Sequence, residues 1–201
     1  AVLFYFRKDI VSFFDNRVLF FKVLISSFPV MVVGYFLIET NIIQKLRNIE
    51  VIAWTTTMFA ILLYISDKFK LEKSIKDNLN YKSILFIGLF QILSLIPGVS
   101  RSGIAITAAR LLKFTRVDSA KISFLLSIPI LGAVSIFGFK NILLSDDIFF
   151  SRLNLLSIFI SFFFSLVTIK FFLKYITKFS LNIFVCYRIL LGAILLVLTY
   201  L

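Results

Sequence analysis

Residues 91–103 read Gln91-Ile92-Leu93-Ser94-Leu95-Ile96-Pro97-Gly98-Val99-Ser100-Arg101-Ser102-Gly103, a short polar loop between two hydrophobic segments. The segments on either side, 83–97 and 104–112, are both shorter than the roughly 20 apolar residues that a membrane-spanning helix needs. Proline followed by glycine stops a helix and starts a turn. This pattern predicts a re-entrant helical hairpin over about 83–112, which a membrane tolerates only where the loop lines a cavity or is buried in protein.

The composition of the whole chain indicates a membrane protein. Hydrophobic residues make up 60% of the sequence and the mean hydropathy is +1.03, whereas soluble domains are about 45–50% apolar. Five longer apolar runs can each span a membrane; they are 18–38, 51–65, 122–139, 153–169 and 181–201. We therefore predict an all-α, polytopic integral membrane bundle that forms a single domain over residues 1–201.

The basic residues predict the orientation of this bundle. The net charge is +12, but the Lys and Arg residues lie in short loops, which favours contact with anionic lipid headgroups and argues against a nucleic-acid partner. A hairpin that enters and leaves on one side puts its flanks, 67–82 and 110–121, together, with five and four Lys or Arg. The opposite loops, 40–50 and 140–150, carry two and one. The positive-inside rule then places the flanks in the cytoplasm and the loop tip nearer the outer face.

Two residue types limit the chemistry. The single cysteine, Cys186, lies in an apolar run, so neither a disulfide framework nor a cysteine-based metal site is expected. Histidine is absent, which excludes histidine-dependent catalysis within these residues. The chain starts at Ala1, and residues 1–6 read like the tail of an apolar helix, so we expect an N-terminal segment to be missing.

Arg101 is the residue of the loop that most needs an explanation, because a charge at membrane depth is costly unless it is paired. Gly98 and Gly103 allow close approach of the backbone to a ligand, and Ser100 and Ser102 offer hydroxyl groups. A helix that starts near residue 104 would direct its positive end at the same place, and arginine binds phosphate through two parallel hydrogen bonds. These features predict an oxyanion site; the alternative is that Arg101 ends the hairpin and pairs with an acid elsewhere.

Two further residues are candidates for the same site. Gln91 lies within two turns of the loop and either faces the cavity or bonds a neighbouring helix. Arg188 is about seven residues deep in the last apolar run, so it needs a polar partner or a watery cavity. It either reaches the cavity or extends to the membrane surface, and the sequence leaves both alternatives open.

The sequence resembles a known family. The stretch 91–103, followed by Ser123-Phe124-Leu125-Leu126-Ser127-Ile128-Pro129, resembles the undecaprenyl-diphosphate phosphatases, also called the bacitracin-resistance family. The opening Tyr5-Phe6-Arg7-Lys8-Asp9 and the closing Tyr187-Arg188 resemble it too, so the likeness covers essentially the whole chain. The resemblance implies an inverted-repeat fold with two re-entrant hairpins, and removal of one phosphate from undecaprenyl diphosphate to recycle the lipid carrier for cell-wall synthesis. It also implies that Arg101 binds the diphosphate, assisted by Ser100 and Ser102.

The sequence departs from the family pattern in two places. The family's N-terminal hairpin carries a Glu-x-x-x-Glu pair and a Ser-Ser-x-x-His element, and neither occurs here. The resemblance implies that those residues hold a divalent cation, Mg or Ca, and act on the phosphorus, so we expect no metal ligands in this chain and no activity from this fragment alone. After the loop the sequence reads Ile104-Ala105-Ile106-Thr107, which lacks one hydroxyl at Ala105 but keeps Thr107 as a candidate phosphate contact.

Three functions are compatible with these sequence features. A lipid diphosphatase in the bacterial inner membrane, acting on a polyprenyl diphosphate, is the main hypothesis. Broken helices aimed at an anion serve a transporter of lipid phosphate equally well, and a structural membrane subunit would make Arg101 dispensable. The sequence does not determine the oligomeric state, for which a homodimer is one candidate.

Overall fold

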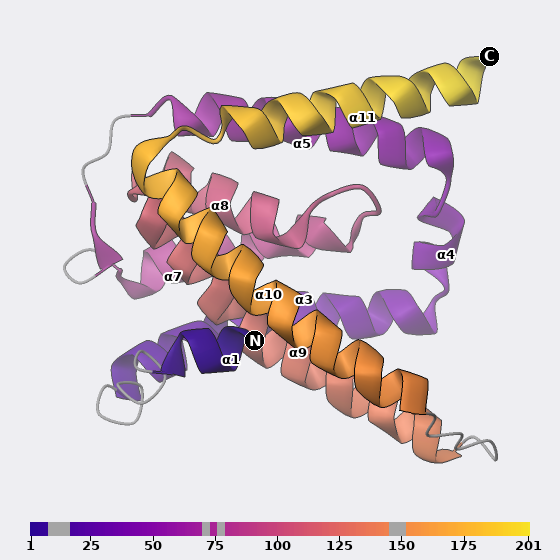
Figure 1. The fold of residues 1–201 in the computed structure, drawn as a ribbon, viewed down its shortest axis with the longest axis horizontal. Helices are drawn as coiled ribbons and strands as arrows, with labels where there is room; N and C mark the ends of the chain where they lie inside the picture. The colour runs from indigo at the N-terminus through magenta and orange to yellow at the C-terminus, as the bar shows by residue number, and fades with distance from the viewer. Residues whose placement is uncertain (8–16, 70–72, 76–78, 145–151) are drawn as a thin grey trace.

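The computed structural model describes residues 1–7, 17–69, 73–75, 79–144 and 152–201 (Figure 1). These residues form helices and, apart from an isolated bridge between Lys73 and Phe114, no β-structure within the described ranges. The elements in chain order are α1 (Val2–Tyr5), α3 (Arg17–Glu39), α4 (Ile42–Leu46), α5 (Ile49–Asp67), α7 (Tyr81–Ile92), the 3-10 turn η1 (Leu93–Leu95), α8 (Arg101–Leu111), α9 (Arg116–Leu144), α10 (Arg152–Lys178) and α11 (Asn182–Tyr200). The prediction of an all-α fold is confirmed.

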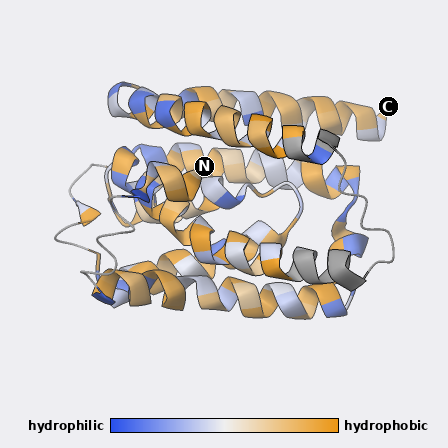
Figure 2. Ribbon diagram, turned by 60° about the horizontal axis from the view of Figure 1, so that its bottom comes forward, coloured by the Kyte–Doolittle hydropathy of each residue, from blue (hydrophilic) through white to orange (hydrophobic). Residues whose placement is uncertain are grey.

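Five of these helices are long and apolar enough to cross a membrane: α3, α5, α9 over Arg116–Ile136, α10 over Leu156–Lys178, and α11. They coincide with the five predicted runs, and Figure 2 shows hydrophobic residues along most of their length. Helix α10 extends well beyond the predicted end at residue 169, because Lys170, Lys174 and Lys178 continue the helix, and lysine is a good helix former. The chain is therefore a multi-pass membrane protein.

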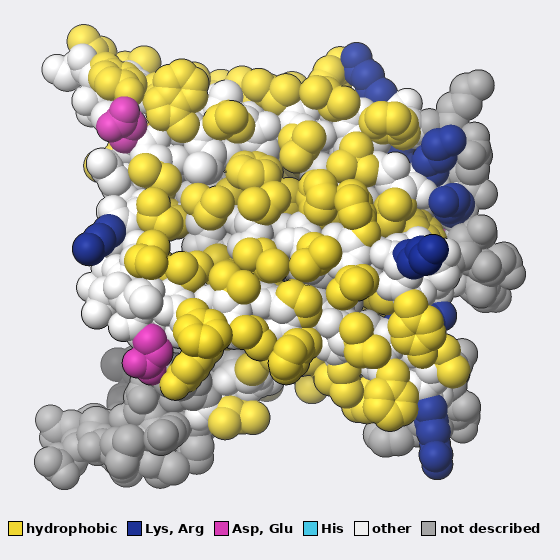
Figure 3. All heavy atoms as spheres, turned by 180° about the vertical axis from the view of Figure 1, so that it is seen from behind, with side chains coloured by type: hydrophobic (Ala, Val, Ile, Leu, Met, Phe, Trp, Pro, Cys, Tyr) yellow, Lys and Arg dark blue, Asp and Glu magenta, His cyan; other side chains and the backbone are white. Residues whose placement is uncertain are grey.

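The exposed surface has the character expected for contact with lipid. Figure 3 shows a broad band of hydrophobic side chains, with Lys and Arg gathered along one edge of the molecule. Many large apolar side chains are exposed, among them Phe159, Phe163 and Phe171, all on α10. A surface of this kind is unfavourable in water and favourable in a bilayer.

The predicted hairpin is formed by α7, η1 and α8, which pack on each other and on the long helices around them. Its loop points toward the end of the molecule where α4 and the C-terminus lie (Figure 1). The hairpin sits against α3 because Gly88 lets α7 approach closely: a Cβ there would overlap the backbone of Ser26. Ser26 Oγ also donates to the carbonyl oxygen of Ile84 at 2.7 Å, so this buried hydroxyl ties the two helices together.

The last span packs on α5 along a similarly close contact. A Cβ at Gly192 of α11 would overlap Thr57 Oγ1 and lie 3.2 Å from the carbonyl oxygen of Ala53. Small residues at such a crossing let two membrane helices approach and gain packing energy. This contact fixes α11 beside α5, and both helices pass the hairpin loop.

Candidate functional site

Helix α5 holds the hairpin loop by its carbonyl oxygens. Thr55 Oγ1 donates to the carbonyl oxygen of Pro97 at 2.7 Å, and Thr56 Oγ1 donates to that of Gly98 at 3.2 Å. Gly98 has φ +88°, and a Cβ there would overlap Thr55 Oγ1 and lie 2.6 Å from the carbonyl oxygen of Ile52. Glycine is required at this position both by the left-handed backbone and by the close approach to α5.

The start of α8 is capped by a serine of the loop. Ser100 is the N-cap residue, and its Oγ accepts a hydrogen bond from the backbone N–H of Gly103 at 3.1 Å. Ser100 Oγ also lies 3.3 Å from Ser102 Oγ. The first turn of a helix carries unpaired N–H groups and a partial positive charge, so two hydroxyls at this point form a polar surface suited to an anion.

Arg188 of α11 lies against the same turn. Its Nη2 donates to the carbonyl oxygen of Gly98 at 2.9 Å, and its Nη1 lies 2.9 Å from the position that a Cβ on Gly103 would take. The guanidinium therefore rests on the N-terminus of α8, next to the serine hydroxyls. Of the two alternatives that the sequence left open for Arg188, the structure has the side chain reaching the loop.

These groups line one end of a cavity of about 320 Å³. The polar lining comes from Thr56, Gly98, Ser100, Ser102, Gly103 and Arg188. The remaining lining is mostly apolar and comes from α5, α8, α10 and α11: Leu63, Ile106, Phe172, Leu181, Phe184, Tyr187 and Leu191. The cavity thus combines a small polar, positively charged end with an apolar remainder.

Arg101 does not line this cavity. It is the first residue of α8 and half-buried, and its guanidinium has no hydrogen bond or ion pair within the described part of the chain. The alternative pairing with an acid therefore finds no partner among the described residues. The role of Arg101 in phosphate binding stays a prediction.

Gln91 and Thr107 are buried beside the loop but do not line the cavity. Thr107 Oγ1 donates to the carbonyl oxygen of Gly103 at 2.8 Å, one turn back in the same helix. Gln91 is 1% exposed, and neither polar atom of its side-chain amide has a partner in the described ranges. The structure thus brings together Gly98, Ser100, Ser102, Gly103 and Arg188 in the cavity lining, which includes neither Gln91 nor Thr107.

Sequence reasoning missed several groups that the cavity uses. Thr55 and Thr56 carry no signal in the sequence, because their bonds to the loop depend on tertiary contacts that no sequence pattern shows. The apolar wall of α11 did leave a signal. Leu181, Phe184, Arg188 and Leu191 recur at helical spacing, so they share one face.

The residues of the cavity do not fit a divalent cation. Hard cations such as Mg²⁺ and Ca²⁺ prefer carboxylate oxygens, but the cavity's oxygen donors are hydroxyls and carbonyls. No group of three or more His, Cys, Asp or Glu side chains is arranged to hold a metal within the described residues. What the described site offers is positive charge and hydrogen-bond donors.

A family model described as bacitracin resistance protein BacA matches residues 1–194. The chain belongs to this family. The match includes every element that lines the cavity, from α5 to α11. The family suggested by the loop and by 123–129 is therefore confirmed.

Relatives named undecaprenyl-diphosphatase match along the chain. The one from Pelagibacter ubique (strain HTCC1062) is 50% identical over 201 residues, which cover 100% of this chain and 78% of the relative. The one from Jannaschia sp. (strain CCS1) is 33% identical and covers 100% of this chain and 80% of the relative. The one from Elusimicrobium minutum (strain Pei191) is 38% identical and covers 98% and 78%.

Proposed function

We propose that the protein is a membrane phosphatase that hydrolyses undecaprenyl diphosphate to undecaprenyl phosphate and inorganic phosphate, and that the cavity at the hairpin loop binds the substrate. The observation that carries this proposal is the position of Arg188, whose guanidinium lies on the N-terminus of α8 at one end of an otherwise mostly apolar cavity. A lipid with an anionic head has the same division into a charged and an apolar part. The names of the relatives support the same substrate.

The described residues have a defined share of this reaction. Arg188, the Ser100 and Ser102 hydroxyls and the first turn of α8 bind the diphosphate and neutralise the charge that develops as the P–O bond breaks. Arg101, the first residue of α8, carries a second positive charge at the same helix start and is proposed to contact the diphosphate as well. Apolar side chains such as Phe172 and Phe184 would contact the first prenyl units and keep water away from them. The hydrolysis itself needs a water molecule and a base, and the described cavity contains no side chain suited to act as that base.

The proposal includes the membrane in which the protein acts and its need for a divalent cation. The family and its relatives support a bacterial inner membrane. The gathering of Lys and Arg at one edge of the molecule supports an orientation with that edge in the cytoplasm. The resemblance to the family supports a dependence on Mg or Ca, although the described cavity lacks the carboxylates such an ion prefers. Removal of divalent cations with a chelator should then abolish phosphate release, and release that persists would remove the cation from the proposal.

The test separates hydrolysis from transport. The protein is reconstituted into liposomes that contain undecaprenyl diphosphate, and both released inorganic phosphate and movement of the lipid between leaflets are measured. Phosphate release that falls on Arg188→Ala supports the proposal. Lipid movement without phosphate release would instead support the transporter, which no observation on the structure or the relatives now favours.

A further inference from the structure

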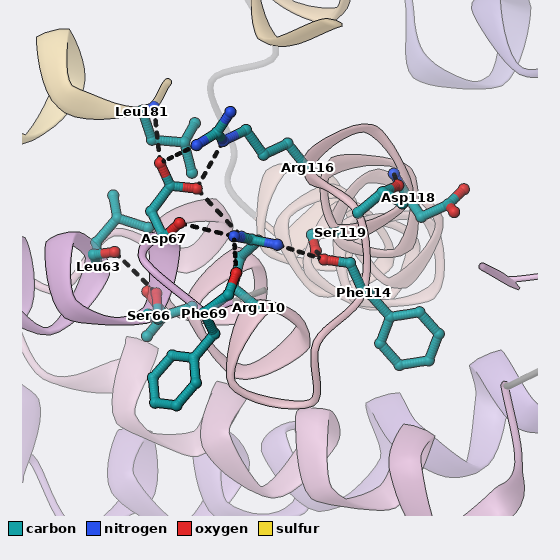
Figure 4. A network of polar contacts seen from close by, with 12 residues as sticks. Leu63, Ser66, Asp67, Phe69, Arg110, Phe114, Arg116, Asp118, Ser119 and Leu181 are labelled. Atoms are coloured by element: carbon teal, nitrogen blue, oxygen red, sulfur yellow. Dashed lines mark hydrogen bonds and ion pairs between the residues drawn. The ribbon is translucent and has the colours of Figure 1, made fainter. Parts of the chain in front are cut away.

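A buried carboxylate at the far end of the hairpin joins four parts of the fold. Asp67, the last residue of α5, has a side chain that is only 4% exposed. Its Oδ1 accepts hydrogen bonds from Arg110 Nε at 3.1 Å and from Arg116 Nε at 2.8 Å. Its Oδ2 accepts from Arg116 Nη2 at 3.0 Å and from the backbone N–H of Leu181 at 3.2 Å. Figure 4 shows these contacts converging on the one carboxylate from α8, α9 and the turn before α11.

The described hydrogen bonds of the Arg110 side chain all lie within this cluster. Its side chain is 0% exposed, Nη1 donates to the carbonyl oxygen of Phe114 at 2.7 Å, and Nη2 donates to those of Asp67 at 2.8 Å and Phe69 at 3.1 Å. The sequence reading placed Arg110 among the cytoplasmic charges that face lipid headgroups. The expected contact with headgroups is wrong for this residue, because its side chain is buried and its charge is compensated inside the protein.

The cluster and the loop are connected by helices of matched length. Helices α5 and α8 both run from the loop toward the cluster, α5 from Thr56 to Asp67 and α8 from Ser100 to Arg110. At about 1.5 Å of rise per residue, each covers roughly 15 Å between its two fixed points. At one end Thr56 holds the loop, and at the other Asp67 holds Arg110.

Helix α11 is bonded to the same carboxylate at its start. The turn that starts it is fixed by the bond from Leu181 N–H to Asp67 Oδ2, and two turns later Arg188 reaches Gly98. One carboxylate is therefore bonded, through Arg110 and Leu181, to α8 and to the start of α11 and itself ends α5, the three helices that bring Thr56, the serine loop and Arg188 to the cavity. A slide of α8 along α5 would separate Arg188 from the N-terminus of α8.

We propose that Asp67 is a positioning residue for the reaction: through Arg110, Arg116 and Leu181 it sets the register of the hairpin loop against Arg188. This inference rests on the proposed function, in which Arg188 contacts the diphosphate. Asp67 itself lies at the other end of α8 and takes no part in the chemistry. Its effect on activity should pass through the position of Arg188.

The experiment is a double-mutant cycle on phosphate release from undecaprenyl diphosphate. Asp67→Asn keeps the size of the side chain but leaves the buried guanidinium of Arg110 and the partly exposed one of Arg116 without their carboxylate, so it can prevent folding. Arg116→Gln is the milder variant, because Arg116 is 27% exposed and Arg110 keeps its bond to Asp67. Arg116→Gln and Arg188→Lys should each lower kcat/KM. The loss in the double variant should be about tenfold smaller than the product of the two single losses, as expected for residues whose effects are coupled.

A second readout does not depend on hydrolysis. Ser102 is exposed at the loop, so with Cys186 replaced by serine a cysteine at position 102 reports the loop position by its rate of thiol labelling. Arg116→Gln should change this rate by about threefold or more without lowering the melting temperature enough to unfold the protein during the assay. Asp118→Asn is the matched control, because it removes a carboxylate from the start of the same helix as Arg116 and leaves the cluster intact. In this variant neither the labelling rate nor kcat/KM should change.

The outcomes separate this inference from the proposed function. If wild-type protein releases no phosphate but Arg116→Gln still shifts the labelling rate, the proposed function fails and the register role of the cluster stands. Two results with active wild-type protein would show that Asp67 is not a positioning residue. One is an unchanged labelling rate in Arg116→Gln; the other is an effect on kcat/KM in the double variant that equals the product of the two single effects.

Discussion

Arg188 Nη2 donates to the carbonyl oxygen of Gly98 at 2.9 Å, a hydrogen bond between the last span and the hairpin loop, 90 positions apart in the sequence. This bond joins α11 to a carbonyl oxygen that also accepts from Thr56 Oγ1 of α5. It uses one of the five N–H donors of arginine, so the guanidinium can bind the loop and an anion at the same time.

Arg101→Lys should lose most of the phosphatase activity while the protein still inserts in the membrane. Lysine keeps the charge but lacks the planar fork that binds two phosphate oxygens at once, so a loss of about 10- to 100-fold in kcat/KM is expected. The measurement is phosphate release by protein whose amount in the membrane is matched to wild type. Near-normal turnover would remove Arg101 from the site.

Gly98→Ala should destabilise the protein as well as inactivate it. The added Cβ would overlap Thr55 Oγ1 and crowd the backbone of Ile52, and alanine at a positive φ costs about 1–2 kcal/mol in addition. Thermal unfolding in detergent should show a melting temperature lower by about 5 °C.

Gly132→Ala is the matched control for Gly98→Ala. A Cβ at Gly132 of α9 meets nothing within 4 Å, and alanine in a helix interior is favoured over glycine by about 0.5–1 kcal/mol. Its melting temperature should stay the same or rise. Equal losses in the two variants would show that the left-handed turn is not what makes Gly98 necessary.

Gly103→Ala should lower the activity of the protein without lowering its stability. The new Cβ would lie 2.9 Å from Arg188 Nη1 and 3.2 Å from Ser100 Oγ, so the flexible arginine must move away from the helix start. We expect kcat/KM to fall by about tenfold with an unchanged melting temperature, because alanine is a better helix residue than glycine. Wild-type activity in this variant would mean that the position of Arg188 over α8 does not matter.

Much of the fold could be read from the sequence because it depends on local features. Runs of apolar residues gave the five long helices, and the Pro97-Gly98 break gave the hairpin and its loop. Gly98 as a turn residue followed from the same rules, whereas the helix after the loop begins at Arg101, with Ser100 as its cap, and not near residue 104 as the sequence predicted.

The rest of the site depends on contacts between segments far apart in the chain. Nothing near Thr56 indicates that its hydroxyl bonds to Gly98, and the sequence could not decide whether Arg188 reached the loop or the membrane surface. Arg110 and Arg116 read as similar cytoplasmic charges, although the structure buries the first and leaves the second partly exposed. Charge alone cannot distinguish these cases, because burial is set by the packing of α5, α8 and α9.

The orientation in the membrane stays a prediction with a direct test. The loop should be reachable from the outer side and not from the cytoplasm, because the Lys and Arg residues gather at the opposite end of the hairpin. Val99 is only 7% exposed and would make a poor probe. The exposed Ser102 is therefore replaced by cysteine, with Cys186 changed to serine, and intact cells are treated with an impermeant thiol reagent. Labelling that requires opening of the inner face would overturn the topology.

The central claim is that the cavity beside Arg188 binds the diphosphate head of the lipid, and equilibrium binding of undecaprenyl diphosphate to purified protein tests it most directly. Loss of a charged hydrogen-bond donor costs about 1.5–3 kcal/mol, so Arg188→Ala should raise the Kd by about 10- to 100-fold. The melting temperature of the variant should stay close to that of wild type, because Arg188 makes its described hydrogen bond only to Gly98. A Kd for undecaprenyl diphosphate that is the same in Arg188→Ala and in wild type would contradict the account, because the substrate would then bind elsewhere.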